Sequence, residues 1–456
     1  MIHKYESNGY FIVLDVNSGC VHVVDKIIYD MLDYVDDPKQ DEVPAALYEQ
    51  MKDYSKEEVD AAYEEIRELQ KAGKLFSPDE YEEIAERIRQ LSPVKALCLH
   101  IAHDCNLRCD YCFASTGEYN QHKRSLMSLE VGKKAIDFVV KESKGRRNIE
   151  IDFFGGEPLM NFEVVKQIVA YAEEQGKLHD KNFRFTITTN GMLLTDDKIE
   201  FINEHMDNIV LSIDGRKEVN DRVRHTISGD GCYDIILPKF KKVAESRNQD
   251  RYYVRGTFTK YNLDFANDVL SLADEGFEQI SVEPVVTSDD MPYALTEADL
   301  PKVYEEYDRL AVEMLKRRKE GKWFNFFHFM VDLEQGPCVI KRLHGCGAGN
   351  EYLAITPEGD IYPCHQFVGH EEFKMGSVFE DNLNLELKKT FAFTNVYTKP
   401  DCKKCWAKFY CSGGCKANSY LYCGDLNKPY QIACDMERKR VECAIMMRAA
   451  EMLDED

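Results

Sequence analysis

The sequence has no uninterrupted apolar run long enough to cross a membrane, although 44% of its 456 residues are hydrophobic. A transmembrane helix needs about 20 consecutive apolar residues, so we expect no membrane-spanning helix and no membrane partner. The first residues, Met1 to Tyr5, also lack the apolar segment of a secretory signal peptide. These absences predict a cytoplasmic protein, in which thiols stay reduced.

Positive charge is scarce as well. The chain has 58 lysines and arginines against 81 aspartates and glutamates, a formal net charge of -23. Nucleic acids and anionic membrane surfaces are therefore poor partners. Cysteine, in contrast, is abundant: sixteen cysteines in a reducing compartment indicate metal ligation and not disulfides.

Three of the cysteines, Cys105, Cys109 and Cys112, form a C-x3-C-x2-C motif, here called the cysteine triad. Three thiolates this close can each bind one iron of a [4Fe-4S] cluster, which leaves the fourth iron without a protein ligand. A zinc ion would need a fourth ligand, and no residue nearby in the sequence supplies one, which disfavours the alternative of a partial zinc site. An iron with an open position can bind and activate a small molecule.

The spacing of the triad, with Tyr111 directly before Cys112, resembles the signature of radical S-adenosylmethionine (SAM) enzymes. The resemblance implies that the amino and carboxylate groups of SAM bind the open iron. Electron transfer from an external low-potential donor would then cleave SAM to methionine and a 5′-deoxyadenosyl radical. The resemblance therefore assigns Cys105, Cys109 and Cys112 to catalysis and metal binding, and Tyr111 to the cofactor pocket.

Further residues at predicted strand ends resemble the SAM-binding positions of that family. Gly155-Gly156-Glu157 closes the second predicted strand, where glycines let the backbone approach a ligand and a carboxylate can accept from an ammonium group. The resemblance implies that this motif meets the methionine amino group. The alternative for the polar residues of later strands is that they cap strands or pair with one another. The resemblance assigns four of these to SAM binding: Asn190, Ser212, Asp214 and Arg224.

From residue 94 onwards, predicted strands alternate with helical patterns such as Leu129–Lys141 and Phe162–Gln175. Repeated β-then-α units imply a parallel sheet, and six of them predict a partial (β/α)6 barrel of the TIM type over residues 94–309. Function is then expected at the carboxyl ends of the strands, where the triad falls. The predicted strands are Val94–His103, Ile149–Phe154, Phe183–Thr188, Ile209–Ile213, Tyr252–Phe258 and Ile280–Val285.

Residues 1–76 are predicted to form a small separate domain. Tyr10–Leu14 and Val21–Val24 form a hairpin, helices follow, and Leu75-Phe76 is expected to add a wing strand. This arrangement resembles the winged-helix element that binds the leader peptides of ribosomally made, modified peptides. Glutamates on its last helix disfavour DNA, and a structural cap without a partner is the alternative. Residues 77–93 are predicted to be a connecting helix and linker.

A second cysteine array occupies residues 310–456, which begin in a predicted bridging helix. The pattern C-x12-G-x4-C, then C-x2-C-x5-C-x3-C and a last cysteine, resembles the SPASM extension of radical SAM peptide-modifying enzymes. The resemblance implies two auxiliary [4Fe-4S] clusters, and so three in all; a zinc ribbon is the alternative for some of these thiols. One auxiliary cluster would be held by Cys402, Cys405, Cys411 and Cys434 (the four-cysteine set), and the other by Cys346, Cys364 and Cys415 (the three-cysteine set).

The three-cysteine set is one thiolate short of a closed cluster. Either Cys338 supplies the fourth ligand, or a substrate cysteine binds the open iron, which is the hypothesis we favour. His365 stands where sulfatase-maturing relatives have an Asp general base. This departure argues against the same oxidation chemistry, and we expect His365 to support the cluster.

The whole arrangement resembles the thioether-forming maturases of ribosomal peptides, among which the maturases of SCIFF peptides are the family most alike. The resemblance implies sactionine crosslinks between cysteine sulfur and a backbone carbon of an acceptor residue in a Cys-rich precursor peptide. Two alternatives stay open: another peptide modification, such as carbon–carbon crosslinking or side-chain oxidation of the sulfatase-maturase type, and a non-catalytic iron–sulfur electron carrier. An electron carrier needs no SAM pocket, which speaks against the last.

Overall fold

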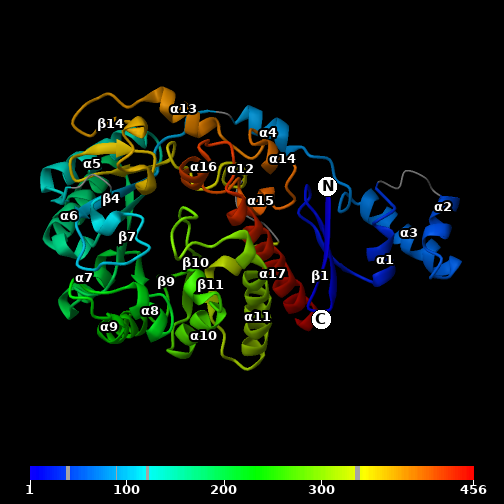
Figure 1. Ribbon diagram of the computed structural model, residues 1–456. Helices are drawn as coiled ribbons and strands as arrows, with labels where there is room; N and C mark the ends of the chain where they lie inside the picture. The colour runs from blue at the N-terminus through cyan, green and yellow to red at the C-terminus, as the bar shows by residue number, and fades with distance from the viewer. Residues whose placement is uncertain (37–41, 89, 120–122, 334–338, 456) are drawn as a thin grey trace.

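The structure is a computed structural model that describes residues 1–36, 42–88, 90–119, 123–333 and 339–455; all statements below concern these residues. A three-stranded antiparallel sheet lies at the N-terminus, and a larger sheet forms the body of the molecule (Figure 1). None of the helices in the described ranges combines the length and apolar character needed to cross a lipid bilayer.

The N-terminal sheet has the order β1 (Ile2–Ser7), β2 (Tyr10–Asp15), β3 (Val21–Val24). The predicted hairpin is β2 and β3, whereas β1 was not predicted. Both faces of β2 are buried: Ile12 and Leu14 pack into the main core, and Val13 packs under the N-terminal helices. These helices are α1 (Lys26–Met31), α2 (Ala45–Gln50) and α3 (Lys56–Lys71), followed by α4 (Tyr81–Arg87).

The predicted wing strand at Leu75-Phe76 is wrong. Leu75 is buried among the N-terminal helices, and Phe76 has a φ of 55°, a left-handed conformation that ends any extended strand. After this turn, the Ser77 amide donates to the Asp15 carboxylate at 2.8 Å. The segment is therefore fixed to the end of β2 by a side chain and not by a strand ladder.

The larger sheet contains the six predicted strands as consecutive parallel neighbours, so the α/β prediction is confirmed. Helices separate them along the chain. The strands bury apolar side chains, and polar residues stand at their carboxyl ends. The strands are β4 (Ala96–His103), β6 (Asn148–Gly155), β7 (Asn182–Thr189), β8 (Asn208–Ser212), β9 (Tyr252–Phe258) and β10 (Gln279–Pro284). The helices are α5 (Leu129–Glu142), α6 (Phe162–His179), α7 (Asp196–His205), α8 (Lys217–Val223), α9 (Tyr233–Ser246), α10 (Ala266–Asp274) and α11 (Leu300–Lys319).

The same sheet continues into the C-terminal region, which the sequence did not predict. β11 (Asn325–Phe326) pairs with β10, and β12 (Tyr352–Ile355) runs parallel to β4 on its other side. Residues on either side of the expected boundary at 309/310 therefore share one hydrogen-bonded sheet. Its remaining strands are β5 (Ser125–Leu126), which pairs with β4, and the antiparallel β13 (Asp360–Tyr362) and β14 (Gly376–Ser377).

The last helix, α17 (Gln431–Glu455), lies along α11 and also contacts the N-terminal sheet, which brings the two chain ends to the same side (Figure 1). Tyr5 of β1 donates to the Glu442 carbonyl at 3.0 Å, and His3 lies 2.9 Å from the Glu442 carboxylate. The shorter helices of this region are α12 (Val339–His344), α13 (Leu385–Phe393), α14 (Pro400–Lys403), α15 (Lys408–Cys411) and α16 (Lys416–Cys423).

Candidate functional site

The cysteine triad lies in the loop after β4, at the carboxyl edge of the parallel sheet. Every residue of β4 is buried. Backbone hydrogen bonds from Arg108 to the His225 carbonyl (2.8 Å) and from Asp110 to the Val223 carbonyl (3.0 Å) fix the loop to the segment around the end of α8. The triad therefore lies where active sites of parallel α/β folds are found.

The electrostatics of the triad fit an iron–sulfur cluster. Burial raises the pKa of the Cys105 thiol to about 12 and also raises the pKa of Cys109, and the neighbouring Cys112 adds to both shifts. Three thiolates this close and this buried need positive charge between them. Iron ions supply that charge, and each iron of a cubane takes one thiolate, so the donor set fits three corners of a [4Fe-4S] cluster.

Gly155 and Gly156, at the end of β6, lie directly against the start of the triad loop. The Gly156 amide donates to the Ala102 carbonyl at 2.7 Å. A Cβ on Gly156 would lie 2.1 Å from the Asp104 carbonyl oxygen and 3.1 Å from the Cys105 Cβ. The glycines are therefore needed even without a ligand, because they allow the end of β6 to approach the loop that carries the triad.

Glu157 is fully buried and bound by the chain itself. Its carboxylate accepts from the Thr189 hydroxyl at 2.8 Å, from the Asn190 amide at 2.8 Å and from the Leu159 amide at 3.0 Å. Burial raises the pKa of Glu157 to about 7 against the opposing effect of these hydrogen bonds. The side chain thus ties the end of β6 to the end of β7, and direct contact with SAM remains a prediction.

Asp214, Arg224 and Tyr111 form one buried group beside the triad. The Asp214 carboxylate accepts from the Tyr111 hydroxyl at 2.7 Å, from Arg224 Nε at 2.8 Å and from the Thr257 amide at 2.9 Å. Asp214 and Arg224 therefore do pair with each other, the alternative that the sequence left open. The Arg224 guanidinium lies 5.5 Å from the Tyr111 ring centroid, and its positive charge lowers the pKa of the Cys109 thiol against the effect of burial. The group therefore joins the triad loop to β8 and β9.

Asn190 and Ser212 complete the residues predicted for the cofactor. Asn190 Nδ2 donates to the Asn106 side chain at 2.8 Å and lies 3.6 Å from Cys105 Sγ. Ser212 ends β8 and is half-buried. The structure thus gathers all the predicted SAM-pocket residues along the strand ends that face the triad loop, from β6 to the segment after α8.

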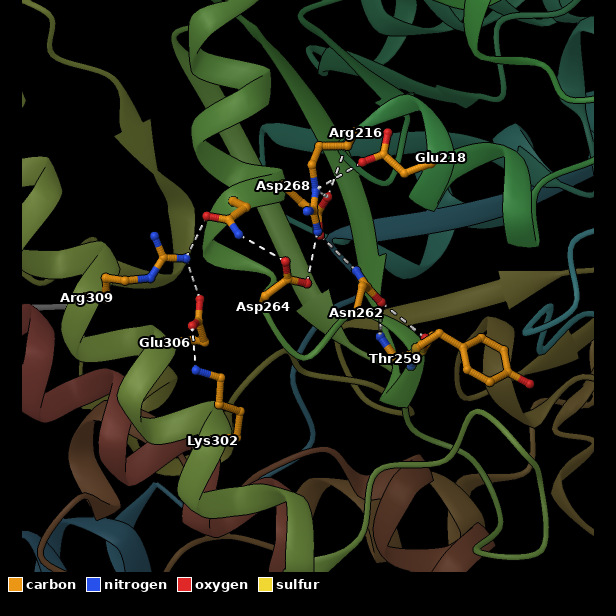
Figure 2. Close-up of polar contacts among 11 residues, drawn as sticks. Arg216, Glu218, Thr259, Asn262, Asp264, Asp268, Lys302, Glu306 and Arg309 are labelled. Atoms are coloured by element: carbon orange, nitrogen blue, oxygen red, sulfur yellow. Dashed lines mark hydrogen bonds and ion pairs between the residues drawn. The ribbon is translucent and has the colours of Figure 1, made fainter.

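A buried carboxylate behind these strand ends holds the β8 and β9 loops together (Figure 2). Asp268 accepts hydrogen bonds from Arg216 Nε at 2.8 Å and from Asn262 Nδ2 at 3.0 Å. Gly215 has a φ of +129°, and a Cβ there would lie 2.2 Å from the Asp268 Cβ. This contact fixes the peptide that follows Asp214. Sequence reasoning missed it, because one aspartate on a helix gives no pattern.

The four cysteines of the four-cysteine set line one small cavity, together with Gly413. Arg438 of α17 donates to Cys405. Within the described ranges, no three His, Cys, Asp or Glu side chains converge as ligands of a single metal ion. Cysteines of a cubane each bind a different iron and therefore stand farther apart than ligands of one ion. Four thiols around a cavity fit such a cluster.

The three-cysteine set is also brought together. Burial raises the pKa of Cys364, and the charges of Cys415 and Cys346 add to the shift, which places the three thiols next to one another. They come from the loop between α12 and β12, the end of β13 and the start of α16. Cys338, the candidate fourth ligand, lies outside the described residues.

His365 lies between the triad loop and the three-cysteine set. Its ring centroid is 5.4 Å from that of Phe113, beside the triad, and 5.2 Å from that of Phe154 on β6. Tyr352 OH lies 3.4 Å from His365 Nδ1. Burial lowers the pKa of His365 to about 4, so the imidazole is neutral at pH 7 and can accept or donate a hydrogen bond in this gap.

The segment between Cys405 and Cys411 is covered by residues from the start of the chain. The His3 ring stacks on Trp406 with centroids 3.7 Å apart. Asp79 binds the buried Lys408 ammonium at 2.6 Å, and the Tyr81 and Phe409 rings lie 4.8 Å apart. Three side chains of this segment, Trp406, Lys408 and Phe409, thus depend on contacts with residues 3, 79 and 81.

The chain carries two recognisable domains. Residues 99–260 match the Radical SAM superfamily, and residues 346–406 match the SPASM iron-sulfur cluster-binding domain. The first range contains the triad, and the second begins at Cys346, the first cysteine of the three-cysteine set. The protein therefore has a radical SAM domain followed by a SPASM domain, and these domains imply SAM and [4Fe-4S] clusters as cofactors.

Several known proteins match this chain over most of its length. The radical SAM cyclopropyl synthase TigE of Paramaledivibacter caminithermalis is 22% identical, over 95% of this chain and 92% of its own length. The cysteine-type anaerobic sulfatase-maturating enzyme of Clostridium novyi is 24% identical, over 69% of this chain and 86% of its own. Two crystal structures of Streptococcus suis SuiB, one with SAM and one with the precursor peptide SuiA, match with a TM-score of 0.53 over 94% of this chain and 97% of theirs, at 18% and 16% identity. The likeness to SuiB shows a shared fold.

Proposed function

We propose that the protein is a radical SAM peptide maturase that installs thioether crosslinks between cysteine sulfur and a backbone carbon of an acceptor residue in a Cys-rich precursor peptide. The observation that carries the proposal is the arrangement of the cysteines in three sets. The triad lies beside the polar strand ends, and the four-cysteine and three-cysteine sets lie in and after the SPASM domain. This arrangement supports one SAM-binding and two auxiliary clusters. The sulfatase-maturating enzyme, whose name gives a protein as its target, and SuiB, which was crystallised with the precursor peptide SuiA, support a peptide or protein substrate.

The residues of this chain have positioning roles in that reaction. Cys105, Cys109 and Cys112 would hold the cluster that binds SAM, and Tyr111, Asp214 and Arg224 fix the triad loop to the strand ends. When bound, SAM and the clusters supply a carbon-centred radical that removes a hydrogen atom from the peptide, and an acceptor for the electron left when the carbon–sulfur bond forms. The protein orients both partners and keeps water out.

A second peptide modification is supported by a specific finding. The sulfatase-maturating enzyme of Clostridium novyi covers 69% of this chain at 24% identity, so side-chain oxidation of a protein substrate is the rival proposal. Against it stands His365, a weakly basic imidazole packed between aromatic rings at the position after Cys364. Crosslinking between two carbons is a further member of the same class.

Product mass separates these reactions. We expect a precursor co-expressed with the enzyme to lose two hydrogens per crosslink, and to lose one alkylatable cysteine with each. A carbon–carbon crosslink removes the same mass but leaves every thiol free for alkylation, whereas side-chain oxidation changes one residue and links none. Mass spectrometry with and without iodoacetamide measures both quantities. Full alkylation of a product that is two hydrogens lighter would rule out the thioether.

We further propose that residues 1–76 bind the leader of the precursor. In the part of the chain that the structure describes, β3 pairs with β2 alone and forms an edge of the small sheet, and extended peptides add to such edges through main-chain hydrogen bonds. Replacing the leader by a Gly/Ser segment of equal length is expected to lower the modification rate at limiting enzyme by roughly 100-fold, because tethering is lost. Initial rates measured for both precursors test this, and equal rates would contradict the assignment.

A further inference from the structure

Three lysines in the SPASM region, Lys388, Lys399 and Lys416, are buried without a carboxylate partner among the described residues, and thiol charges act on the last two. Lys399 is 1% exposed and Lys416 is 7% exposed. Lys399 Nζ donates to the Gly413 carbonyl at 2.8 Å, and Lys416 Nζ donates to the Phe391 carbonyl at 2.7 Å. A carbonyl offers only a partial charge, and an ammonium group out of water needs a full one nearby.

The positions of the two lysines relative to the thiols differ. Gly413, which binds Lys399, lies between Cys411 of the four-cysteine set and Cys415 of the three-cysteine set, and it lines the cavity of the four-cysteine set. Thiol charges of both sets act on Lys399. Lys416 directly follows Cys415, and the charges of Cys415 and Cys346 in the three-cysteine set act on it. Lys399 therefore lies beside both sets, whereas Lys416 lies beside the three-cysteine set.

Buried ammonium groups beside the cysteines would stabilise iron–sulfur clusters, whose negative charge changes with their redox state. A cubane held by thiolates is an anion and gains one more negative charge when it is reduced. A fixed cation beside it stabilises the reduced form more than the oxidised form, since the attraction grows with the charge of the cluster. The absence of a carboxylate partner agrees with this role, because a carboxylate beside either lysine would cancel the stabilisation of the reduced cluster.

We propose that Lys399 raises the reduction potential of both auxiliary clusters, and that Lys416 raises that of the three-cysteine cluster alone. Both clusters thereby accept more readily the electron that the substrate releases when the carbon–sulfur bond forms. The lysines are positioning charges, because neither is a ligand. This inference rests on the proposed auxiliary clusters.

The test is a redox titration of the full-length chain, reconstituted with iron and sulfide, in a background with the triad replaced by alanine so that only the auxiliary clusters remain. Lys399→Met is expected to shift both potentials to more negative values, and Lys416→Met only one of them. Lys389→Met, on the exposed face of α13, is the matched control, because water screens its charge. Lys399→Arg keeps the charge and is expected to keep both potentials near those of the parent.

Several outcomes overturn the inference. Unchanged potentials in Lys399→Met with all iron retained would do so, as would equal shifts in Lys399→Met and Lys399→Arg, which would indicate a structural effect and not a charge. If Lys399→Met loses iron, Lys416→Met decides: a shift in both clusters, or in neither, contradicts the proposal. Failure of the proposed function is separate, because a parent chain that binds no auxiliary cluster would show it before any lysine is changed.

Discussion

Replacing Cys105, Cys109 and Cys112 together by alanine is expected to abolish SAM cleavage and to remove about one third of the bound iron, roughly four of twelve atoms. The four-cysteine and three-cysteine sets share no cysteine with the triad, so they should keep their share of the iron. Iron and sulfide analysis of the anaerobically reconstituted protein, and detection of 5′-deoxyadenosine by chromatography, measure the two effects.

Cys20→Ala is the control for this variant. Cys20 is a half-buried free thiol of the N-terminal domain and belongs to none of the three sets, so iron content and SAM cleavage should stay at the parent level. Retained SAM cleavage in the triple variant would contradict the assignment of the triad. Loss of all iron in that variant would contradict the independence of the auxiliary sites.

Gly156→Ala is expected to reduce SAM cleavage at least about 100-fold, the scale on which a misplacement of about 1 Å acts on catalysis. The added methyl group would meet the backbone of Asp104, which a rotamer change cannot move aside, and would press on Cys105. The triad loop therefore has to shift. Steady-state rates of 5′-deoxyadenosine formation, together with iron content, show whether the cluster, the cofactor or both are displaced.

Gly145→Ala is the matched control, since a Cβ there meets no atom within 4 Å and no unusual φ is required. Gly145→Ala should leave the rate of SAM cleavage unchanged. The two variants are compared at equal iron loading. A Gly156→Ala enzyme with parent activity would show that the approach of β6 to the triad loop is not needed for catalysis, and that the motif acts only through Glu157.

The sequence predicted well those features that repeat along the chain. The six parallel strands appear within a few residues of their predicted bounds, because apolar residues on strands flanked by helices leave a local pattern. The two auxiliary cysteine sets were grouped through their resemblance to the SPASM pattern, and the structure brings together the thiols of each set.

Features that depend on distant partners were not predicted. β12 pairs with β4 although more than 200 residues separate them, and the four residues of β12 contain no pattern that predicts this partner strand. α17 was missed because its stretch from Cys443 to Ala450 is buried on several sides, against α11 and the N-terminal sheet, and such a helix lacks a single apolar face. The wing strand failed at Phe76, whose left-handed φ has no signal in the residue type.

The polar residues of the pocket show a third kind of limit. Their gathering at the strand ends was predictable, and the pairing of Asp214 with Arg224 was one of the alternatives. The other partners were not predicted: Asp214 also accepts from the Tyr111 hydroxyl, and Glu157 accepts from the Thr189 hydroxyl and the Asn190 amide. A motif states which side chains meet, but the hydrogen bonds that each one has left for a ligand follow only from the fold.

The cover over the segment between Cys405 and Cys411 has a consequence for engineering by module exchange. A peptide-recognition module taken from another enzyme and joined at residue 94 would bring no equivalents of His3, Asp79 and Tyr81. It would leave the Lys408 ammonium, only 2% exposed, without its carboxylate. A working chimaera has to keep α4 with the recipient and restore an aromatic ring opposite Trp406, so the usable junction lies before residue 79 and not after it.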